Sequence, residues 1–147
     1  MRIAGPGDVP ALLDLIEALN RFEGTPWSRD TGAPALRTLL ADESLGVAVL
    51  VEDGGAPLGY YVLTWGYDLE WKGRDAFLTD LYLVPEARGR GLGRQAMQHV
   101  LETARRHDAC AIHLMVRPDN FAAAKLYAST GFASPPRVLL SKALDVA

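Results

Sequence analysis

The sequence predicts an α/β fold built on a mixed, mainly antiparallel β-sheet, with a β-α-β crossover and helices on both faces. Three observations predict this class. Helical periodicity fills the N-terminal third, strand-like apolar runs joined by turn sequences fill the middle, and strand and helix patterns alternate in the last third. A meander followed by a β-α-β unit requires a mixed sheet, because the strands joined by the crossover run parallel.

The N-terminal third is expected to hold a short strand and two helices. Residues 1–4 form the strand, which ends at a Gly-Pro-Gly sequence. Asp8 is a favourable N-cap, and leucine and isoleucine then recur at helical spacing, which predicts a helix over residues 9–22. Residues 24–31 are expected to form a loop, and a further group of leucines predicts a second helix over residues 33–41.

The middle of the chain is expected to form three strands. Two β-rich runs, residues 47–52 and 58–65, flank an Asp-Gly-Gly sequence that is typical of hairpin turns. Residues 66–75 are polar and aromatic, so we expect a loop there. Residues 76–84 form the third expected strand, which Pro85 ends.

The last third alternates between helix and strand. Residues 91–106 carry an apolar helical face, and residues 109–116 are nearly all apolar, as expected for a strand covered on both faces. Asp119 or Asn120 is expected to cap a helix that continues to residue 130. A last strand is expected over residues 138–144.

Length and composition predict one domain spanning residues 1–147, with a net charge of -3. This balance does not favour a nucleic-acid partner. The single cysteine, Cys110, excludes an intramolecular disulfide and a thiolate cluster, and the histidines lack metal-ligand spacing, so no metal is expected. The sequence has no apolar run long enough for a membrane helix and no signal-type region, which predicts a cytoplasmic protein without a membrane partner.

Residues 80–94 carry the clearest chemical signal. A strand runs into a loop with glycine at alternate positions and then directly into a helix. Glycine lets the backbone approach a ligand closely, and the N–H groups of a helix N-terminus favour an anion. The segment therefore predicts a pyrophosphate site, to which three arginines add positive charge. The glycines are Gly89, Gly91 and Gly93, and the arginines are Arg88, Arg90 and Arg94.

Three phosphate-binding patterns compete for this segment. A Walker A loop requires Lys and then Ser or Thr after the last glycine, but Arg94 and Gln95 follow Gly93. A dinucleotide fingerprint requires a different glycine spacing and a later acidic residue, which are absent. The pattern R/Q-x-x-G-x-G/A is matched by Arg88, Gly91 and Gly93. A loop that only turns the chain is the alternative, and the strand–loop–helix context argues against it.

Over nearly its whole length the sequence resembles the GNAT N-acetyltransferases. Residues 80–94 are similar to the coenzyme A pyrophosphate motif of that family. Residues 120–132, which read NFAAAKLYASTGF, are similar to its N-x-x-A-x-x-L-Y-x-x-x-G-F signature. The resemblance implies an enzyme that transfers an acetyl group from acetyl-CoA to an amine, by direct attack in a ternary complex.

Shorter motifs resemble the diamine (spermidine/spermine) and thialysine N-acetyltransferase branch. They are residues 19–23, the segment around Asp68 and Trp71, and residues 78–82. This resemblance implies a small primary amine as acceptor, namely a diamine, a polyamine or a lysine-like molecule. The branch usually carries Glu immediately before the motif aspartate, where this chain has Thr79. A protein or peptide acetyltransferase and a non-catalytic CoA-binding regulator are the alternatives.

The resemblance also implies which residues hold acetyl-CoA. A bulge in the motif strand separates it from the next parallel strand, and the pantetheine arm lies in the gap. The N–H of Leu83 is expected to bind the acetyl carbonyl, and Asn120 the pantetheine arm. The full set of expected cofactor contacts is Leu81, Tyr82, Leu83, Arg88, Gly89, Arg90, Gly91, Leu92, Gly93, Arg94 and Asn120.

Tyr127 matches the family tyrosine whose hydroxyl lies near the CoA sulfur, and a phenol of pKa about 10 is a suitable proton donor to a thiolate. The identity of the base stays open. Asp80 lies in an otherwise apolar strand and needs a partner, so it is either a base or a structural residue. The other carboxylates considered are Glu23, Asp68 and Glu70. The expected acceptor-site residues are Glu23, Asp68, Trp71 and Thr79.

Trp71 stands beside an acidic residue and is either an aromatic wall for a cationic amine or a lid over the core. The last expected strand, residues 138–144, has an edge with little chain left to cover it, and exposed edges tend to be paired. The family resemblance also implies dimers built around C-terminal strands, so we expect a homodimer.

Overall fold

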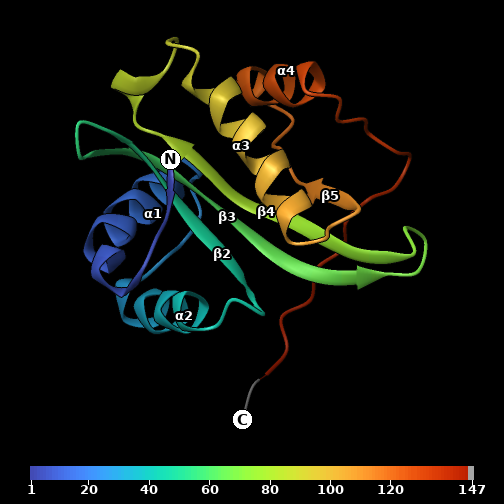
Figure 1. The fold of residues 1–147 in the computed structure, drawn as a ribbon, viewed down its shortest axis with the longest axis horizontal. Helices are drawn as coiled ribbons and strands as arrows, with labels where there is room; N and C mark the ends of the chain where they lie inside the picture. Colours follow the sequence, from blue (N-terminus) through green and yellow to red (C-terminus); the bar gives the residue numbers. More distant parts are fainter. Residues whose placement is uncertain (146–147) are drawn as a thin grey trace.

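A computed structural model describes residues 1–145 as one sheet with helices packed on both of its faces (Figure 1). The strands are β1 (Arg2–Ile3), β2 (Gly46–Asp53), β3 (Ala56–Asp68), β4 (Gly73–Leu83) and β5 (Ala111–Leu114). The helices are α1 (Val9–Glu23), α2 (Arg29–Ala41), α3 (Leu92–Arg106) and α4 (Phe121–Ser129), with short 3-10 turns at Pro6–Asp8 and Pro85–Ala87.

The strands lie in sequence order, β1-β2-β3-β4-β5. Neighbouring strands are antiparallel from β1 to β4, whereas β4 and β5 pair in parallel through the α3 crossover. The predicted mixed sheet with a β-α-β crossover is therefore confirmed.

Alternate residues of the central strands feed two separate cores. On β2 and β3, Leu50 and Tyr60 pack with α1 and α2, while Val49 and Tyr61 pack with α3 on the other face. This alternation follows from the two-residue period of a strand. Figure 1 shows the result, with α1 and α2 on one side of the sheet and α3 and α4 on the other.

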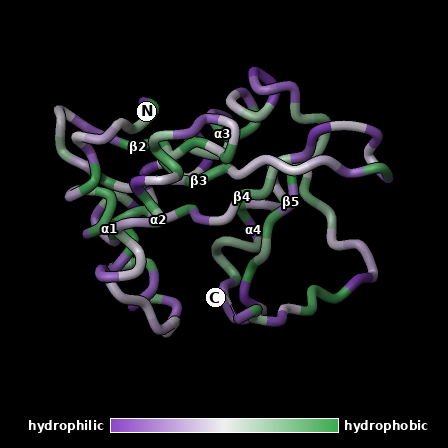
Figure 2. The backbone as a smooth tube through the Cα atoms, turned by 90° about the horizontal axis from the view of Figure 1, so that it is seen from below, coloured by the Kyte–Doolittle hydropathy of each residue, from purple (hydrophilic) through white to green (hydrophobic). Residues whose placement is uncertain are grey.

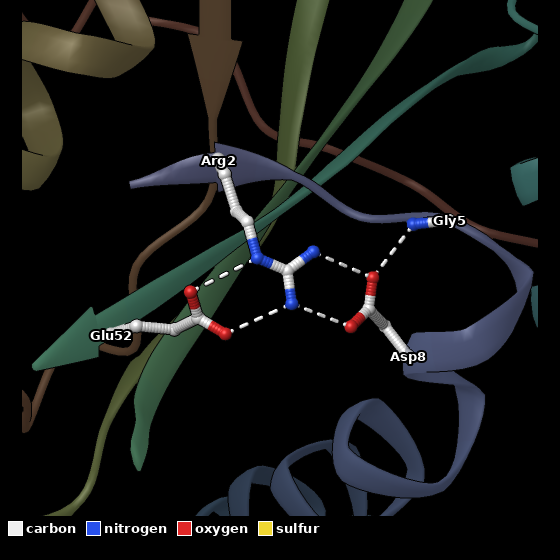
Figure 3. A network of polar contacts seen from close by, with 4 residues as sticks. All are labelled: Arg2, Gly5, Asp8 and Glu52. Carbon is white, nitrogen blue, oxygen red and sulfur yellow. Dashed lines mark hydrogen bonds and ion pairs between the residues drawn. The ribbon is translucent and has the colours of Figure 1, made fainter. Parts of the chain in front are cut away.

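The first helix was predicted closely in extent, but its N-terminus differs from the prediction. Asp8 makes no side-chain cap to α1, because its carboxylate is engaged by Arg2 and by the backbone N–H of Gly5 (Figure 3). Arg2 also binds Glu52 through Nε at 3.0 Å, so its guanidinium joins β1, β2 and the turn before α1. The hydrogen bond from Arg2 is the main cause that lowers the pKa of Asp8 to about 2.

The second helix begins earlier than predicted, at Arg29 rather than at residue 33. Ser28 caps it by accepting a hydrogen bond from the N–H of Asp30 at 3.2 Å. The Trp27 ring lies so close to Gly32 that no side chain would fit there. The helix was predicted from its leucines, the first of which is Leu36, whereas the Ser28 cap and the contact of Trp27 with Gly32 start it earlier.

The expected loop over residues 66–75 is instead the far end of a β-hairpin. β3 continues to Asp68 and β4 begins at Gly73, with Gly66 opposite Asp75 and Tyr67 opposite Arg74. The ladder of backbone hydrogen bonds continues here although the side chains are polar, because an antiparallel pair needs no buried face at its end. Tyr67 is accordingly 75% exposed.

The predicted last strand over residues 138–144 is absent. These residues form no strand, and Val138 and Leu140 are exposed. Figure 2 shows the C-terminal segment as an extended loop that leaves the sheet and carries a hydrophobic stretch. Apolar residues predicted the strand, but no strand of this chain pairs with the segment within residues 1–145. Within residues 1–145 as a whole, no helix has the length and apolar character needed to cross a membrane.

Candidate active site

A bulge in β4 creates the space for the site. Val62 of β3 pairs with Asp80, and the next residue, Leu63, pairs with Leu78, so Thr79 is an extra residue on β4. Bulges bend a strand and locally increase its twist. The parallel pairing of β4 with β5 ends at Leu78 opposite Leu114. Beyond this point the edge of β4 is free, as the family resemblance implied.

The free edge exposes particular backbone groups. Along a strand, the N–H and C=O groups of successive residues point to opposite sides. The N–H of Val84 donates to the carbonyl of Leu58 in β3 at 2.9 Å, so the backbone groups of Leu83 face the free edge. The Nε of Arg88 donates to the Leu83 carbonyl at 3.0 Å from that side. The N–H of Leu83 therefore faces the free edge of β4.

A cavity of about 260 Å³ lies along this edge, and we call it the main cavity because it joins the two sequence motifs, although the cavity beside β5 is larger, at about 540 Å³. It brings together residues from α1, β4, the segment after β5, and α4. Its walls are Leu19, Phe22, Glu23, Leu78, Thr79, Asp80, Leu81, Tyr82, Leu83, Arg88, Gly93, Met115, Val116, Arg117, Asn120, Ala122, Ala123, Leu126 and Tyr127.

The loop before α3 has the backbone expected of an anion site. Gly89 and Gly91 have φ angles of 72° and 77°, a left-handed region that other residues rarely adopt. Gly91 is the N-cap of α3, and no side chain caps that end of the helix in the part of the chain described. The first N–H groups of α3 therefore remain available to an anion, and the helix dipole favours one there.

The arginines of this loop have different roles. The guanidinium of Arg88 lies 5.0 Å from the Phe22 ring and 5.5 Å from the Tyr82 ring, besides its bond to the Leu83 carbonyl. Arg90 forms an ion pair with Asp53 at 3.4 Å, and Arg94 is exposed on the first turn of α3. Arg88 is thus held in the cavity wall by its contacts with Leu83, Phe22 and Tyr82.

Asp80 has the partner that its apolar strand required. The hydroxyl of Tyr60, which is fully buried on β3, donates to Asp80 Oδ2 at 2.6 Å. Burial raises the pKa of Asp80, although the bond from Tyr60 acts in the opposite direction. Sequence reasoning did not identify Tyr60. The available signal was the need of Asp80 for a donor on the neighbouring strand.

Glu23 and Tyr127 both line the main cavity. Glu23 is the last residue of α1, and its backbone carbonyl accepts a hydrogen bond from the Arg117 guanidinium, which also pairs with Asp119. Burial, and then the Glu23 charge, raise the pKa of Tyr127. The Tyr127 phenol therefore stays protonated at neutral pH and is able to donate a proton.

Asn120 is the one of the two predicted candidates that caps α4. Its Oδ1 accepts a hydrogen bond from the N–H of Ala123 at 3.1 Å and so caps α4. Asn120 also lines the main cavity, where the family resemblance implied a contact with the pantetheine arm.

Two predicted acceptor residues lie outside the main cavity. Asp68 is six residues beyond Val62 on β3, which corresponds to about 20 Å along the strand from the level of Asp80. Trp71 follows in the turn of the same hairpin and borders a separate cavity beside β5. Glu70, considered as a base, is paired with Arg137 at 2.7 Å. Of the carboxylates considered, Glu23 and Asp80 line the main cavity.

Comparison with known proteins shows which family the sequence matches. The model of the Acetyltransferase (GNAT) family matches residues 12–132. The chain is similar to the thialysine N-epsilon-acetyltransferase of Bos taurus, with 31% identity over 139 residues, covering 89% of this chain and 82% of that protein.

Two solved structures share the fold. An integron cassette protein from the mobile metagenome of Cole Harbour Salt Marsh matches with a TM-score of 0.87 and 32% identity, covering 99% of this chain and 91% of that one. A structure described as a predicted acetyltransferase with acetyl-CoA, from Clostridium acetobutylicum, matches with a TM-score of 0.82 and 18% identity, covering 96% and 94%.

Proposed function

Because the chain belongs to the Acetyltransferase (GNAT) family, whose members use acetyl-CoA, we propose that it acetylates a primary amine of a small molecule. The proposed acceptor is lysine-like or a short diamine, and the amine attacks the thioester directly in a ternary complex. One observation carries the proposal. Glu23, Asp80 and Tyr127 line one cavity beside the free edge of β4.

In the proposed complex, acetyl-CoA lies along the free edge of β4. The uncapped N–H groups of α3 and the glycine loop that precedes it hold the pyrophosphate. The backbone of Leu81 to Leu83 lines the pantetheine and the thioester, and the amide of Asn120 binds the pantetheine arm. The N–H of Leu83 donates to the acetyl carbonyl, where it stabilises the oxyanion that forms during attack.

Proton transfers complete the reaction. The acceptor amine must lose a proton, and Asp80 accepts it directly or through a water molecule. The raised pKa of Asp80 makes its carboxylate a stronger base than an exposed aspartate. The amine nitrogen forms a bond to the acetyl carbon as the carbon–sulfur bond breaks. Tyr127 gives its proton to the leaving thiolate, and solvent restores the phenol.

The charges in the main cavity suit a small amine. Glu23 and Asp80 supply two carboxylates, enough for an acceptor with one or two ammonium groups. Thr79 contributes a neutral hydroxyl where a third carboxylate would serve a longer polyamine. The similarity to a thialysine N-epsilon-acetyltransferase is consistent with a lysine-like acceptor.

A substrate panel tests the proposal. Thialysine, lysine, putrescine, spermine, an aminoglycoside and a peptide with a free N-terminus are each incubated with acetyl-CoA, and released CoA thiol is measured. We expect the highest kcat/KM for thialysine or a short diamine. A preference for the peptide would replace the proposal with a protein N-acetyltransferase. Binding of CoA with no turnover of any amine would indicate a regulator.

A further inference from the structure

Two carboxylates and an imidazole meet at the end of the sheet far from the main cavity. Asp68 ends β3, Asp75 lies near the start of β4, and His113 lies on β5. One ligand atom from each of these three side chains lies within 4.8 Å of the others. We call this group the Asp–Asp–His cluster. His113 is distant in the sequence from both aspartates, so ligand spacing did not indicate the cluster.

The distances suit a single ion. His113 Nε2 lies 3.2 Å from Asp75 Oδ2. Donor atoms bound to one tetrahedral Zn²⁺ at about 2.0–2.2 Å lie about 3.4 Å from one another. Gly66 stands opposite Asp75 in the hairpin, and a Cβ atom there would lie 2.5 Å from Asp75 Oδ1. The absence of a side chain at Gly66 thus makes room for this carboxylate.

His113 Nε2 indicates what the cluster lacks. The Nε2 atom is covered, although the His113 side chain is 32% exposed, and it makes no hydrogen bond with any described residue apart from its approach to Asp75. An unsatisfied buried polar atom is costly, so a native protein normally provides it with a partner. A protonated Nε2 would form an ion pair with Asp75 Oδ2, whereas an unprotonated Nε2 beside two carboxylates requires a cation. A metal ion bound to the nitrogen lone pair satisfies the imidazole and both carboxylates together.

The surrounding groups leave the cluster open to a cation. Asp68 uses Oδ1 to accept a hydrogen bond from the N–H of Glu70 at 2.7 Å. The Glu70 side chain is occupied by Arg137. Within residues 1–145, no lysine or arginine forms an ion pair with Asp68 or Asp75. The second oxygen of Asp68 therefore remains available as a ligand.

We propose that Asp68, Asp75 and His113 form a binding site for a divalent transition-metal ion, with Zn²⁺ as the best match. Imidazole suits zinc and its neighbours, whereas magnesium and calcium prefer oxygen ligands alone. The ion joins the ends of β3, β4 and β5, with water completing its coordination. Its role is to stabilise the far end of the hairpin, a function separate from acetyl transfer.

The test uses the full chain without an affinity tag. Calorimetric titration with Zn²⁺ should give one site, and Co²⁺ should give a visible absorption band when bound. His113→Gln and Asp75→Asn should each weaken Zn²⁺ binding by at least about tenfold, since even residues that only support a ligand have effects of this size. Zn²⁺ should raise the melting temperature of wild type but not of His113→Gln.

Two control variants separate this site from other zinc ligands. His107→Gln changes a histidine that stacks on Trp65 at 4.7 Å, and Cys110→Ser removes the neighbouring thiol. Both should bind Zn²⁺ like wild type. Loss of binding in Cys110→Ser, equal binding in wild type and His113→Gln, or no binding in wild type would each overturn the proposal. So would His113 ring resonances that respond to pH but not to Zn²⁺.

Discussion

The hydroxyl of Tyr60 lies 2.6 Å from Asp80 Oδ2, and this bond joins the two central strands at the level of the bulge. Tyr60 is fully buried, and burial, followed by the Asp80 charge, raises the pKa of its phenol. Tyr60 therefore stays protonated at neutral pH and donates to Asp80. In our proposal Tyr60 positions the base and limits how far the Asp80 pKa rises.

Replacement of Tyr60 by Phe should shift the pH dependence of acetyl transfer. Burial raises the pKa of Asp80 and the bond from Tyr60 opposes this, so removing the hydroxyl raises that pKa further. Asp80 must be ionised to accept a proton, and the acidic limb of kcat/KM against pH should therefore move to higher pH.

The neighbouring Tyr61 provides the matched control. Tyr61 is equally buried on the same strand, but its hydroxyl bonds to His99 and Thr103 on the opposite face. Tyr61→Phe loses a buried hydrogen bond as well, at a cost of about 1 kcal/mol in stability. The acidic limb of kcat/KM against pH should stay at the wild-type position in Tyr61→Phe. Equal shifts in both variants would remove Tyr60 from the mechanism.

Replacement of Tyr127 by Phe should lower kcat by about 10²- to 10⁴-fold, the range attributed to general acid catalysis. Acetyl-CoA affinity should change little, because the ring remains. Tyr67→Phe is the control, since Tyr67 is an exposed tyrosine on the distant hairpin. The measurement is steady-state release of CoA thiol, with calorimetry for binding. Unchanged kcat in Tyr127→Phe would assign the proton donor elsewhere.

Local patterns sufficed for most of the fold and for the cofactor motif. The bulge and the free edge at Leu83 followed from a family resemblance carried by contiguous residues. The exceptions depend on contacts that the spacing of apolar residues does not report. The start of α2 is fixed by Ser28 and by the packing of Trp27 on Gly32. Periodicity within a segment carries no information on such contacts.

In the candidate active site, too, some residues could be predicted from local sequence and others could not. Residues within the two motifs, such as Asp80 and Tyr127, were predicted and lie in one cavity. Tyr60 was missed because its role depends on strand register. Asp68 was assigned to the acceptor site by resemblance, yet the hairpin places it far along β3. Which end of a long hairpin a residue occupies becomes known only once the pairing is known.

Replacement of Gly91 by Asp should abolish acetyl-CoA binding by placing a negative charge at the N-terminus of α3. Gly91 has a φ of 77°, so any side chain there is strained. Gly91→Asn has the same shape and a similar strain without the charge. Acetyl-CoA at millimolar concentration should raise the melting temperature of wild type. The increase should be smaller for Gly91→Asn and absent for Gly91→Asp. Equal shifts in all three would exclude the loop as the pyrophosphate site.

We propose that the chain forms a homodimer through its C-terminal segment. Val138 and Leu140 are 85% and 88% exposed, and β5 ends the sheet with a free edge. Exposed apolar segments and free edges favour association. Light scattering should give a dimer mass at micromolar concentration, and Leu140→Glu should give a monomer. Ser141→Glu adds the same charge at the adjacent position as a control. A monomeric wild type would contradict the proposal.

The bulge residue Thr79 should determine how many charges the acceptor carries. Thr79 is exposed and lines the main cavity beside Asp80, and its hydroxyl lies 3.5 Å from the Val62 carbonyl. A polyamine needs a carboxylate for each buried ammonium group, because an unpaired buried charge is costly. Glu23 and Asp80 are the two carboxylates that line the main cavity. We therefore expect wild type to prefer thialysine or putrescine to spermine.

Replacement of Thr79 by Glu should move this preference toward spermine. One added charge-assisted contact is worth about 1.5–3 kcal/mol, so the ratio of kcat/KM for spermine to that for thialysine should rise by one to two decades. Thr79→Gln has the same length without the charge and should leave the ratio within about threefold of wild type, as a neutral contact contributes less. A tenfold preference of wild type for spermine, or equal ratios in the Glu and Gln variants, would show that acceptor charge is recognised elsewhere. In that case the bulge at Thr79 serves to open the sheet for acetyl-CoA, and the polar residues of the hairpin become the next candidates for the acceptor.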